Sequence, residues 1–182
     1  MNDESPVQVA APPFREVVRV HQARVHRYCL MLTRDPAQAE DLLQETFVDA
    51  MRGYESYRGD AAVLTWLLTI ARNRCQRMNR LRAGAPPQTE ELMVLGLEAG
   101  WGSAAALEED LDAAVSRAAM SQALEALSPA DCEVITLRDL EELTTREAAE
   151  VLELSEAAVR VRLHRARLRF VAEIRRQGGL DA

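Results

Sequence analysis

The sequence predicts an all-α chain in which an acidic linker joins two small helical domains. Of its 182 residues, 48% are hydrophobic and only 4% are aromatic, and the chain has 8 glycines and 7 prolines. Apolar residues recur at the three- and four-residue steps of amphipathic helices, and the composition gives a sheet little support. Charge is also segregated along the chain, since residues 61–89 contain no acid and residues 83–116 contain no basic residue. These observations predict two basic helical blocks separated by an acidic segment.

The first domain is expected over residues 14–82, after a disordered tail at residues 1–13. Its first helix begins near Phe14, where an apolar stripe starts that comprises Phe14, Val18, His21, Val25, Tyr28 and Leu32. The second helix has strong start signals, because Asp35 can cap it, Pro36 suits the first helical position and Gln38 stands in the capping-box position. Its buried side would consist of Ala39, Leu42, Leu43, Phe47, Ala50 and Tyr54.

A loop at residues 55–60 leads into a third helix. The inward residues of that helix would be Val63, Leu67, Ile70, Ala71, Met78 and Leu81. Another face would carry polar and aromatic groups, namely Trp66, Thr69, Asn73, Arg77 and Arg80. The three helices together predict a compact unit. A linker at residues 83–106 follows, because this segment contains several glycines and prolines and has no sustained period.

The second domain is expected over residues 107–176, with a short tail at 177–182. Its clearest feature is a helix-turn-helix. Thr144 and Glu147 can form a capping box at the first helix, and Ser155 can cap the second, each cap contributing roughly 1 kcal/mol. The second helix and its continuation carry many guanidiniums, at Arg160, Arg162, Arg165, Arg167, Arg169, Arg175 and Arg176. Such a helix suits a polyanion.

The overall composition excludes several other classes of site. The net charge is −7, so only the local distribution of charge favours nucleic acid. Cys29, Cys75 and Cys132 lie far apart without the spacing of a zinc site or a disulfide framework, so we expect buried free thiols and no metal or cofactor. No segment resembles a secretion signal or reaches the roughly 20 apolar residues of a membrane span. The sequence therefore predicts a cytoplasmic protein with no membrane insertion.

Two separate motifs give the chain a resemblance to extracytoplasmic-function (ECF) sigma factors, over about residues 14–176. The first is AEDLLQETF at residues 39–47, followed by YRGD at 57–60 and TWLLTIARN at 65–73. This motif resembles the core-polymerase-binding and minus-ten region of the family. The second is LELSEAAVRVRLHRAR at residues 152–167, which resembles its minus-thirty-five-reading helix. Both motifs in this order make the resemblance highly specific.

The resemblance implies that the outward face of the second helix docks on the clamp helices of RNA polymerase's largest subunit. The matching positions are Asp41, Gln44 and Glu45, beside Leu42 and Phe47. Acidic and amide groups suit a basic partner helix, because electrostatic complementarity fixes the register of docking. The alternative is an ordinary solvated helix face.

For the minus-ten element, the resemblance implies that the protein melts DNA and holds a flipped base beside the third helix. The matching loop and helix-start positions are Tyr57, Arg58, Gly59, Asp60, Thr65 and Trp66. An aromatic ring can replace the stacking lost on unpairing, and guanidiniums can hold phosphates. The third-helix residues expected to reach the strand are Arg72, Asn73, Arg74 and Arg77. For Trp66, a role in the core is the alternative.

For the minus-thirty-five element, the resemblance implies a recognition helix in the major groove. The DNA-binding positions that match are Ser155, Arg160, Val161, Arg162, His164, Arg165 and Arg167. We expect Arg165 to read a base and Arg160, Arg162 and Arg167 to contact mainly the backbone. The chain departs from the family pattern at Val63, Leu64 and Val161, and Glu153 occupies a turn position often held by glycine.

The sequence thus predicts a sigma factor that binds core RNA polymerase and promoter DNA and has no catalytic activity of its own. Whether an anti-sigma factor holds it is left open, as are its promoter and its inducing signal. A stand-alone helix-turn-helix regulator is the alternative, and the two hypotheses differ in the role of residues 41–47. An enzyme finds little support, because no phosphate loop, nucleophile–base pair or metal cluster is evident.

Overall fold

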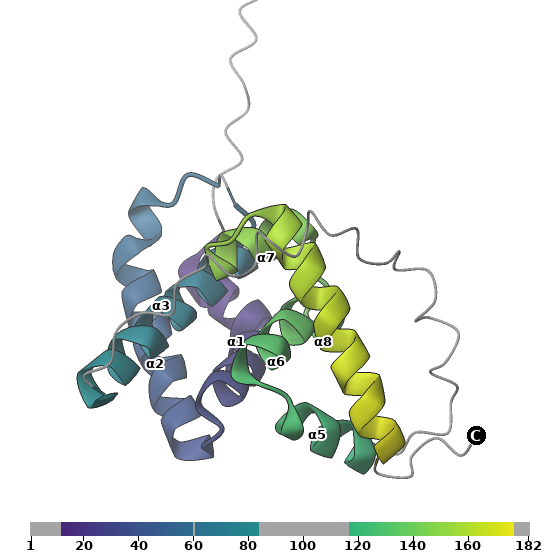
Figure 1. The fold of residues 1–182 in the computed structure, drawn as a ribbon. Helices are drawn as coiled ribbons and strands as arrows, with labels where there is room; N and C mark the ends of the chain where they lie inside the picture. The colour runs from purple at the N-terminus through teal and green to yellow at the C-terminus, as the bar shows by residue number, and fades with distance from the viewer. Residues whose placement is uncertain (1–11, 60, 84–116, 177–182) are drawn as a thin grey trace, which may run out of the picture.

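The computed structural model describes residues 12–59, 61–83 and 117–176, and the regular elements within these ranges are all helical (Figure 1). In chain order they are α1 (Phe14–Thr33), α2 (Pro36–Gly53), the 3-10 turn η1 (Tyr54–Ser56), α3 (Val63–Ala83), α5 (Arg117–Ala126), α6 (Pro129–Ile135), the π-helical turn η3 (Thr136–Leu140), α7 (Thr145–Leu152) and α8 (Glu156–Arg176). The all-α prediction is confirmed for these residues.

Helices α1, α2 and α3 pack against one another as the first domain. Local chemistry sets the α1–α2 corner. Arg34 ends α1 in the left-handed conformation at φ 54°, and its N–H bonds the Leu30 carbonyl at 2.8 Å. Asp35 then caps α2 by accepting from the Gln38 N–H at 2.9 Å, with Pro36 at the first helical position. This is the start signal that the sequence predicted.

The buried faces of these helices differ in part from the predicted stripes. Helix α1 buries Val17 and Cys29 in addition to Val25 and Tyr28, whereas Val18 is only half-buried. Helix α3 is the larger exception, because it buries residues on more than one side, namely Leu64, Thr65, Leu67, Leu68, Ala71 and Cys75. The physical reason is that α3 packs against α1 and α2 and also against α7 of the second domain. Periodicity within the first domain cannot reveal that second neighbour.

The second domain consists of α5, α6, η3, α7 and α8, with α8 packed along α5, α6 and α7 (Figure 1). Ser128 caps α6 by accepting from the Asp131 N–H at 3.2 Å. The chain then widens into the π turn η3, in which the Glu141 N–H bonds the Thr136 carbonyl at 2.8 Å. This turn brings Glu141 into the interior, where only 1% of its surface is exposed.

The two domains touch each other through α3 and α7 and through α1 and α6. In Figure 1 the second domain lies directly against the first rather than apart from it. Several of the predicted segments lie outside the described residues. They are residues 1–11 of the predicted tail at 1–13, residues 84–106 of the predicted linker at 83–106, residues 107–116, and the predicted tail at 177–182. Within the described residues, no helix is long and apolar enough to cross a membrane.

Candidate functional site

The exposed face of α2 carries three of the polar side chains that the sequence singled out. Asp41, Gln44 and Glu45 are all exposed on this helix. Leu42, which was predicted beside them, is fully buried and anchors the helix to the core. Phe47 is half-buried, and its ring meets that of Phe14 edge-on with centroids 6.4 Å apart. The structure therefore separates this set into three surface groups and two packing groups.

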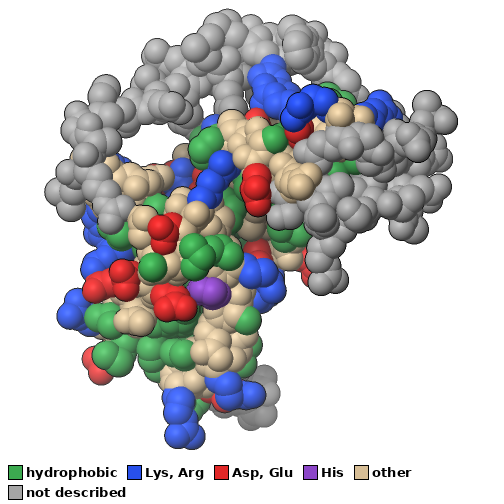
Figure 2. Space-filling view, turned by 90° about the horizontal axis from the view of Figure 1, so that it is seen from below, with side chains coloured by type: hydrophobic (Ala, Val, Ile, Leu, Met, Phe, Trp, Pro, Cys, Tyr) green, Lys and Arg blue, Asp and Glu red, His purple; other side chains and the backbone are tan. Residues whose placement is uncertain are grey.

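A shallow hollow of about 430 Å³ adjoins this face between α1 and α2. Its walls are formed by Gln22, Ala23, His26, Glu40, Leu43 and Gln44. The residues from α1 were missed by the sequence argument, although Gln22 and His26 stand one helical turn apart and so share a face. Figure 2 shows one side of the molecule on which acidic and hydrophobic side chains lie beside a histidine, with arginines around them. A mixed surface of this kind suits a protein partner better than it suits a polyanion.

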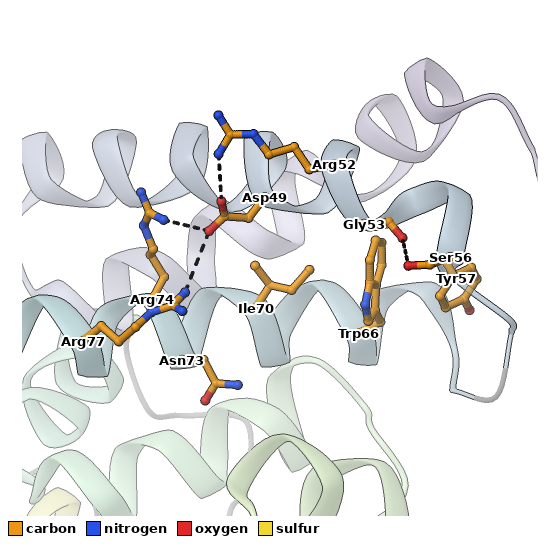
Figure 3. A pocket seen from close by; sticks show the side chains of 10 residues that line it. All are labelled: Asp49, Arg52, Gly53, Ser56, Tyr57, Trp66, Ile70, Asn73, Arg74 and Arg77. Atoms are coloured by element: carbon orange, nitrogen blue, oxygen red, sulfur yellow. Dashed lines mark hydrogen bonds and ion pairs between the residues drawn. The ribbon is translucent and has the colours of Figure 1, made fainter.

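An open pocket of about 500 Å³ lies where α2, η1 and the loop after it meet α3 (Figure 3). It is lined by Asp49, Arg52, Gly53, Ser56, Tyr57, Trp66, Ile70, Asn73, Arg74 and Arg77. Five of the ten predicted minus-ten residues are among them: Tyr57, Trp66, Asn73, Arg74 and Arg77. We call this the aromatic pocket. Residues from three segments meet in it because α2 and α3 pack against each other.

Two aromatic side chains form one end of the aromatic pocket. The rings of Tyr57 and Trp66 have centroids 5.0 Å apart, and their planes are inclined by 36°. Tyr54 stacks on Tyr57 from a centroid distance of 6.1 Å, and the Tyr57 hydroxyl donates to the Ala61 carbonyl. Both Tyr57 and Trp66 are half-buried, so each is held by packing while part of its surface stays accessible. A fixed, partly exposed ring pair is a suitable platform for a nucleobase.

A single carboxylate organises the guanidiniums at the other end of the pocket. Asp49 accepts a hydrogen bond from Arg74 Nη1 at 2.8 Å, and it lies 3.6 Å from Arg52 Nη1 and 3.8 Å from Arg77 Nη2 (Figure 3). Arg74 also bonds Glu45. The wall therefore gathers three guanidiniums around Asp49, which leaves an excess of positive charge suited to phosphate. Asp49 was expected to point outward, and its role depends in part on Arg74 and Arg77, which lie 25 and 28 residues later in the chain.

Four other predicted minus-ten residues do not line the pocket. Arg58 and Gly59 are exposed on the adjoining loop, where Gly59 has a positive φ of 78° that favours glycine. Asp60 is outside the described residues. Thr65 is buried, with 2% of its surface exposed. Arg72 donates to Glu133 of the second domain at 3.0 Å.

The helix-turn-helix has the predicted caps. Thr144 accepts from the Glu147 N–H at 3.2 Å, and the Thr144 N–H donates to the Glu147 carboxylate at 2.7 Å, which completes the capping box. The Thr144 hydroxyl also donates to the Glu147 carboxylate at 2.7 Å, and this bond together with the one from the Thr144 N–H lowers the pKa of Glu147. Glu153 ends α7 in the left-handed conformation at φ 56°, and the Ser155 hydroxyl accepts from the Ala158 N–H at 3.2 Å. The turn has the glycine-like backbone that the sequence position suggested.

Helix α8, which the sequence predicted to be the recognition helix, presents its predicted residues with different degrees of exposure. Arg160 is exposed and pairs with Glu156 at 3.4 Å. Half-buried positions follow at Val161, Arg162, His164, Arg165 and Arg167. Arg167 donates two hydrogen bonds to Asp139 of η3, at 2.6 and 3.1 Å, so its guanidinium is already oriented. No group of three acidic, histidine or cysteine side chains suitable for a metal ion occurs within the described ranges.

Both halves of the chain match known family models. The model for sigma-70 region 2 matches residues 17–84, and the model for sigma-70 region 4 matches residues 117–170. The RNA polymerase sigma factor YlaC of Bacillus subtilis (strain 168) is 32% identical over 154 residues, which cover 84% of this chain and 87% of that protein. The ECF sigma factor SigM of Mycobacterium tuberculosis (strain H37Rv) is 29% identical, with 86% and 74% covered.

Solved structures show a similar fold. The sigma factor RpoE from Bartonella quintana, in complex with the anti-sigma factor NepR, has a TM-score of 0.67 at 21% identity, with 89% of this chain and 96% of RpoE covered. CnrH in complex with the cytosolic domain of CnrY has a TM-score of 0.61 at 23% identity, with 90% and 88% covered. With the two regions in this order and relatives matched along most of their length, the chain belongs to the ECF sigma factors, a group of transcription initiation factors rather than enzymes.

Proposed function

We propose that this chain binds core RNA polymerase, reads minus-ten and minus-thirty-five promoter elements and helps to melt the DNA. The observation that carries the proposal is the aromatic pocket, which combines the Tyr57–Trp66 ring pair with the guanidiniums around Asp49 in one open hollow. Stacking replaces the neighbours that an unpaired base loses, and the positive wall offsets the charge of the strand. Of the motifs above, the pocket is the one best suited to single-stranded DNA.

The overall test is transcription by purified core polymerase on genomic DNA of the source organism, with and without this protein. We expect discrete start sites that share two spaced upstream elements. A protein that neither binds the polymerase nor adds start sites would favour the stand-alone regulator.

Polymerase binding is assigned to the exposed face of α2, and Asp41 is the best position for testing it. Glu45 also bonds Arg74, so a change there would disturb the aromatic pocket as well. Asp41→Arg reverses one exposed charge and is expected to abolish retention on immobilised core polymerase. Glu55→Arg, at an exposed acid of η1, is the matched control. Retention of the Asp41→Arg protein at the wild-type level would count against this docking face.

The stacking role of the aromatic pocket is tested with Tyr57→Ala against Tyr57→Phe in the assembled holoenzyme. The phenylalanine variant keeps the ring and loses only the hydrogen bond to the Ala61 carbonyl. Loss of a base-stacking ring costs about 1–3 kcal/mol, so Tyr57→Ala should weaken binding of a single-stranded minus-ten oligonucleotide roughly 5- to 150-fold. Equal affinities for the two variants would show that the ring does not stack on a base.

Base reading by the recognition helix is assigned to Arg165, because of its position in the family motif at residues 152–167. Arg165→Ala should change the preference at one minus-thirty-five base pair by roughly 1–3 kcal/mol. A panel of single-base promoter variants measures this change in holoenzyme binding. Uniform weakening across the panel would instead make Arg165 a phosphate contact.

An anti-sigma factor is also part of the proposal. The sigma factor RpoE, whose fold is similar, was solved in complex with the anti-sigma factor NepR, and CnrH, whose fold is also similar, was solved in complex with the cytosolic domain of CnrY. We expect a comparable partner to compete with core polymerase for this chain, and competition on immobilised polymerase tests this for any candidate.

A further inference from the structure

Two carboxylates of the second domain are inserted into the surface of the first. Glu141, whose side chain is fully buried, accepts from Arg24 Nε at 2.7 Å and from Arg27 Nε and Nη2 at 3.0 and 3.2 Å. Arg24 also donates to the backbone carbonyl of Glu141. Two guanidiniums of α1 therefore hold one carboxylate that lies more than 100 residues away in the chain.

Glu133 makes the second insertion. Its Oε1 atom accepts from the Tyr28 hydroxyl at 2.8 Å and from Arg72 Nε at 3.0 Å, and the residue is 9% exposed. Burial raises the pKa of Tyr28 well above its usual range, so the hydroxyl stays protonated and can donate. Arg34 adds two bonds at 3.2 Å to the carbonyls of Glu125 and Leu127. We call the contacts of Glu133 and Glu141 with the first domain the carboxylate latch.

The latched arrangement is incompatible with simultaneous contact to both promoter elements. Elements centred about 25 base pairs apart are separated by roughly 85 Å along straight B-form DNA, at 3.4 Å per base pair. In the structure the two domains meet within hydrogen-bonding distance. A chain segment of the size of 84–116 could extend to at most about 110 Å, so the covalent connection permits the separation.

The latch also covers residues that the first domain is expected to use on DNA. Arg72, which was assigned to the minus-ten strand, has its side chain 13% exposed because it is bonded to Glu133. Thr65 is buried where α3 packs near α7. Separation of the domains would expose both residues on α3. The same contacts that close the molecule thus occupy part of the proposed DNA-binding surface.

We propose that the carboxylate latch holds the free chain in a closed, inactive arrangement, and that core polymerase acts on a form in which the domains have separated. The inference rests on the proposed function, since closure matters only if the chain must span two promoter elements. It assigns Glu133 and Glu141 the role of intramolecular inhibitors, with Arg24, Arg27, Tyr28 and Arg72 as their receptors.

The chemistry of the latch suits reversible closure. A buried ion pair gains Coulomb energy but gives up hydration, so the net stability it contributes is small compared with the loss when one partner is removed. On opening, both glutamates regain water, and the guanidiniums of Arg24 and Arg27, which are already 37% and 56% exposed, lose little. A binding partner of ordinary affinity can therefore open the latch, whereas removing its arginines should leave the chain open by default.

The experiment compares the full chain with Arg24→Ala/Arg27→Ala by small-angle X-ray scattering in the absence of polymerase. The matched control is Arg15→Ala/Arg19→Ala, which removes the same charge from the same helix, where Arg19 pairs only locally with Glu16. We expect the latch variant to gain roughly 3 Å or more in radius of gyration over the wild type, against about 16 Å for a compact chain of this length. The control should scatter like the wild type.

Glu141→Gln provides a second variant on the other domain and should expand the chain in the same direction. Far-UV circular dichroism establishes that each variant retains its helices. Wild-type dimensions in both latch variants, or a wild type that is already expanded, would overturn the proposal.

Binding to core polymerase separates this inference from the proposed function. If the latch inhibits, the two latch variants should bind core polymerase several-fold more tightly than the control, because no closed form competes. Expansion without any gain in polymerase affinity would show a hinge with no inhibitory role. Failure of every protein, including the wild type, to bind polymerase would reject the proposed function while leaving the scattering result on closure intact.

Discussion

Glu153 is the clearest single-residue test of backbone strain in this chain. It ends α7 at φ 56°, where a side chain costs roughly 1–2 kcal/mol relative to glycine. Glycine loses about 0.5–1 kcal/mol more conformational entropy on folding, so Glu153→Gly should raise the free energy of unfolding by up to about 1 kcal/mol. Urea denaturation measures the change. Glu150→Gly, in the same helix at ordinary helical φ, should instead lower stability by about 1 kcal/mol.

Cys29 gives a second prediction at the residue scale. It is fully buried in the first domain, and burial raises the pKa of its thiol to about 12. At pH 8 the thiol is protonated and enclosed, so iodoacetamide should modify Cys29 only after unfolding, as mass spectrometry of native and urea-treated protein can establish. Because the folded state holds this proton after the unfolded thiol has lost it, the thiol's contribution to stability should fall as the pH rises from about 9 to about 12. Rapid alkylation of native Cys29 would contradict the buried position.

At the scale of elements, the capping box stabilises the start of α7, the helix that packs against α8. Thr144→Ala removes the bond to the Glu147 N–H and should cost about 1 kcal/mol, whereas Thr144→Ser keeps the hydroxyl and should cost much less. Denaturant unfolding of the two variants gives the comparison. The low pKa of Glu147 adds a pH dependence, because its contribution is present above the unfolded pKa near 4.5 and is lost as the pH falls through the lower folded value. Identical stability of the two variants would show that the cap contributes nothing.

The helix starts and the aromatic pocket differ in how well the sequence predicts them. The starts of α2, α6 and α7 depend on side chains within three residues of the bonds they make, at Asp35, Ser128 and Thr144. Such starts are readable from sequence because the relevant geometry is local. The aromatic pocket is different, since Asp49 and Arg74 meet only through the packing of α2 on α3. Half of the residues that the sequence predicted for the minus-ten element line the pocket, but the prediction missed Asp49, the carboxylate that organises the arginines there.

At the scale of the whole molecule, the latch should make the two domains unfold together. Calorimetry of the wild type should show one transition, because Glu133 and Glu141 bury polar contacts that both domains need. Arg24→Ala/Arg27→Ala should split this into two transitions and lower the first midpoint by roughly 4–8 °C for each kcal/mol of lost coupling. Arg15→Ala/Arg19→Ala should retain the single transition. Two independent transitions in the wild type would mean that the interface does not couple the domains.

The sequence by itself determined the helical class, the helix starts, the helix-turn-helix and the family motifs, because all of these depend on residues a few positions apart. Only the tertiary structure decided which carboxylate meets which guanidinium. Tyr28 and Glu133 are 105 positions apart, and Arg24 and Glu141 are 117 apart, so no local period links them. Their pairing follows from the packing of α1 against α6, where a buried charge is tolerated only if an opposite charge or a hydrogen-bond donor is packed against it.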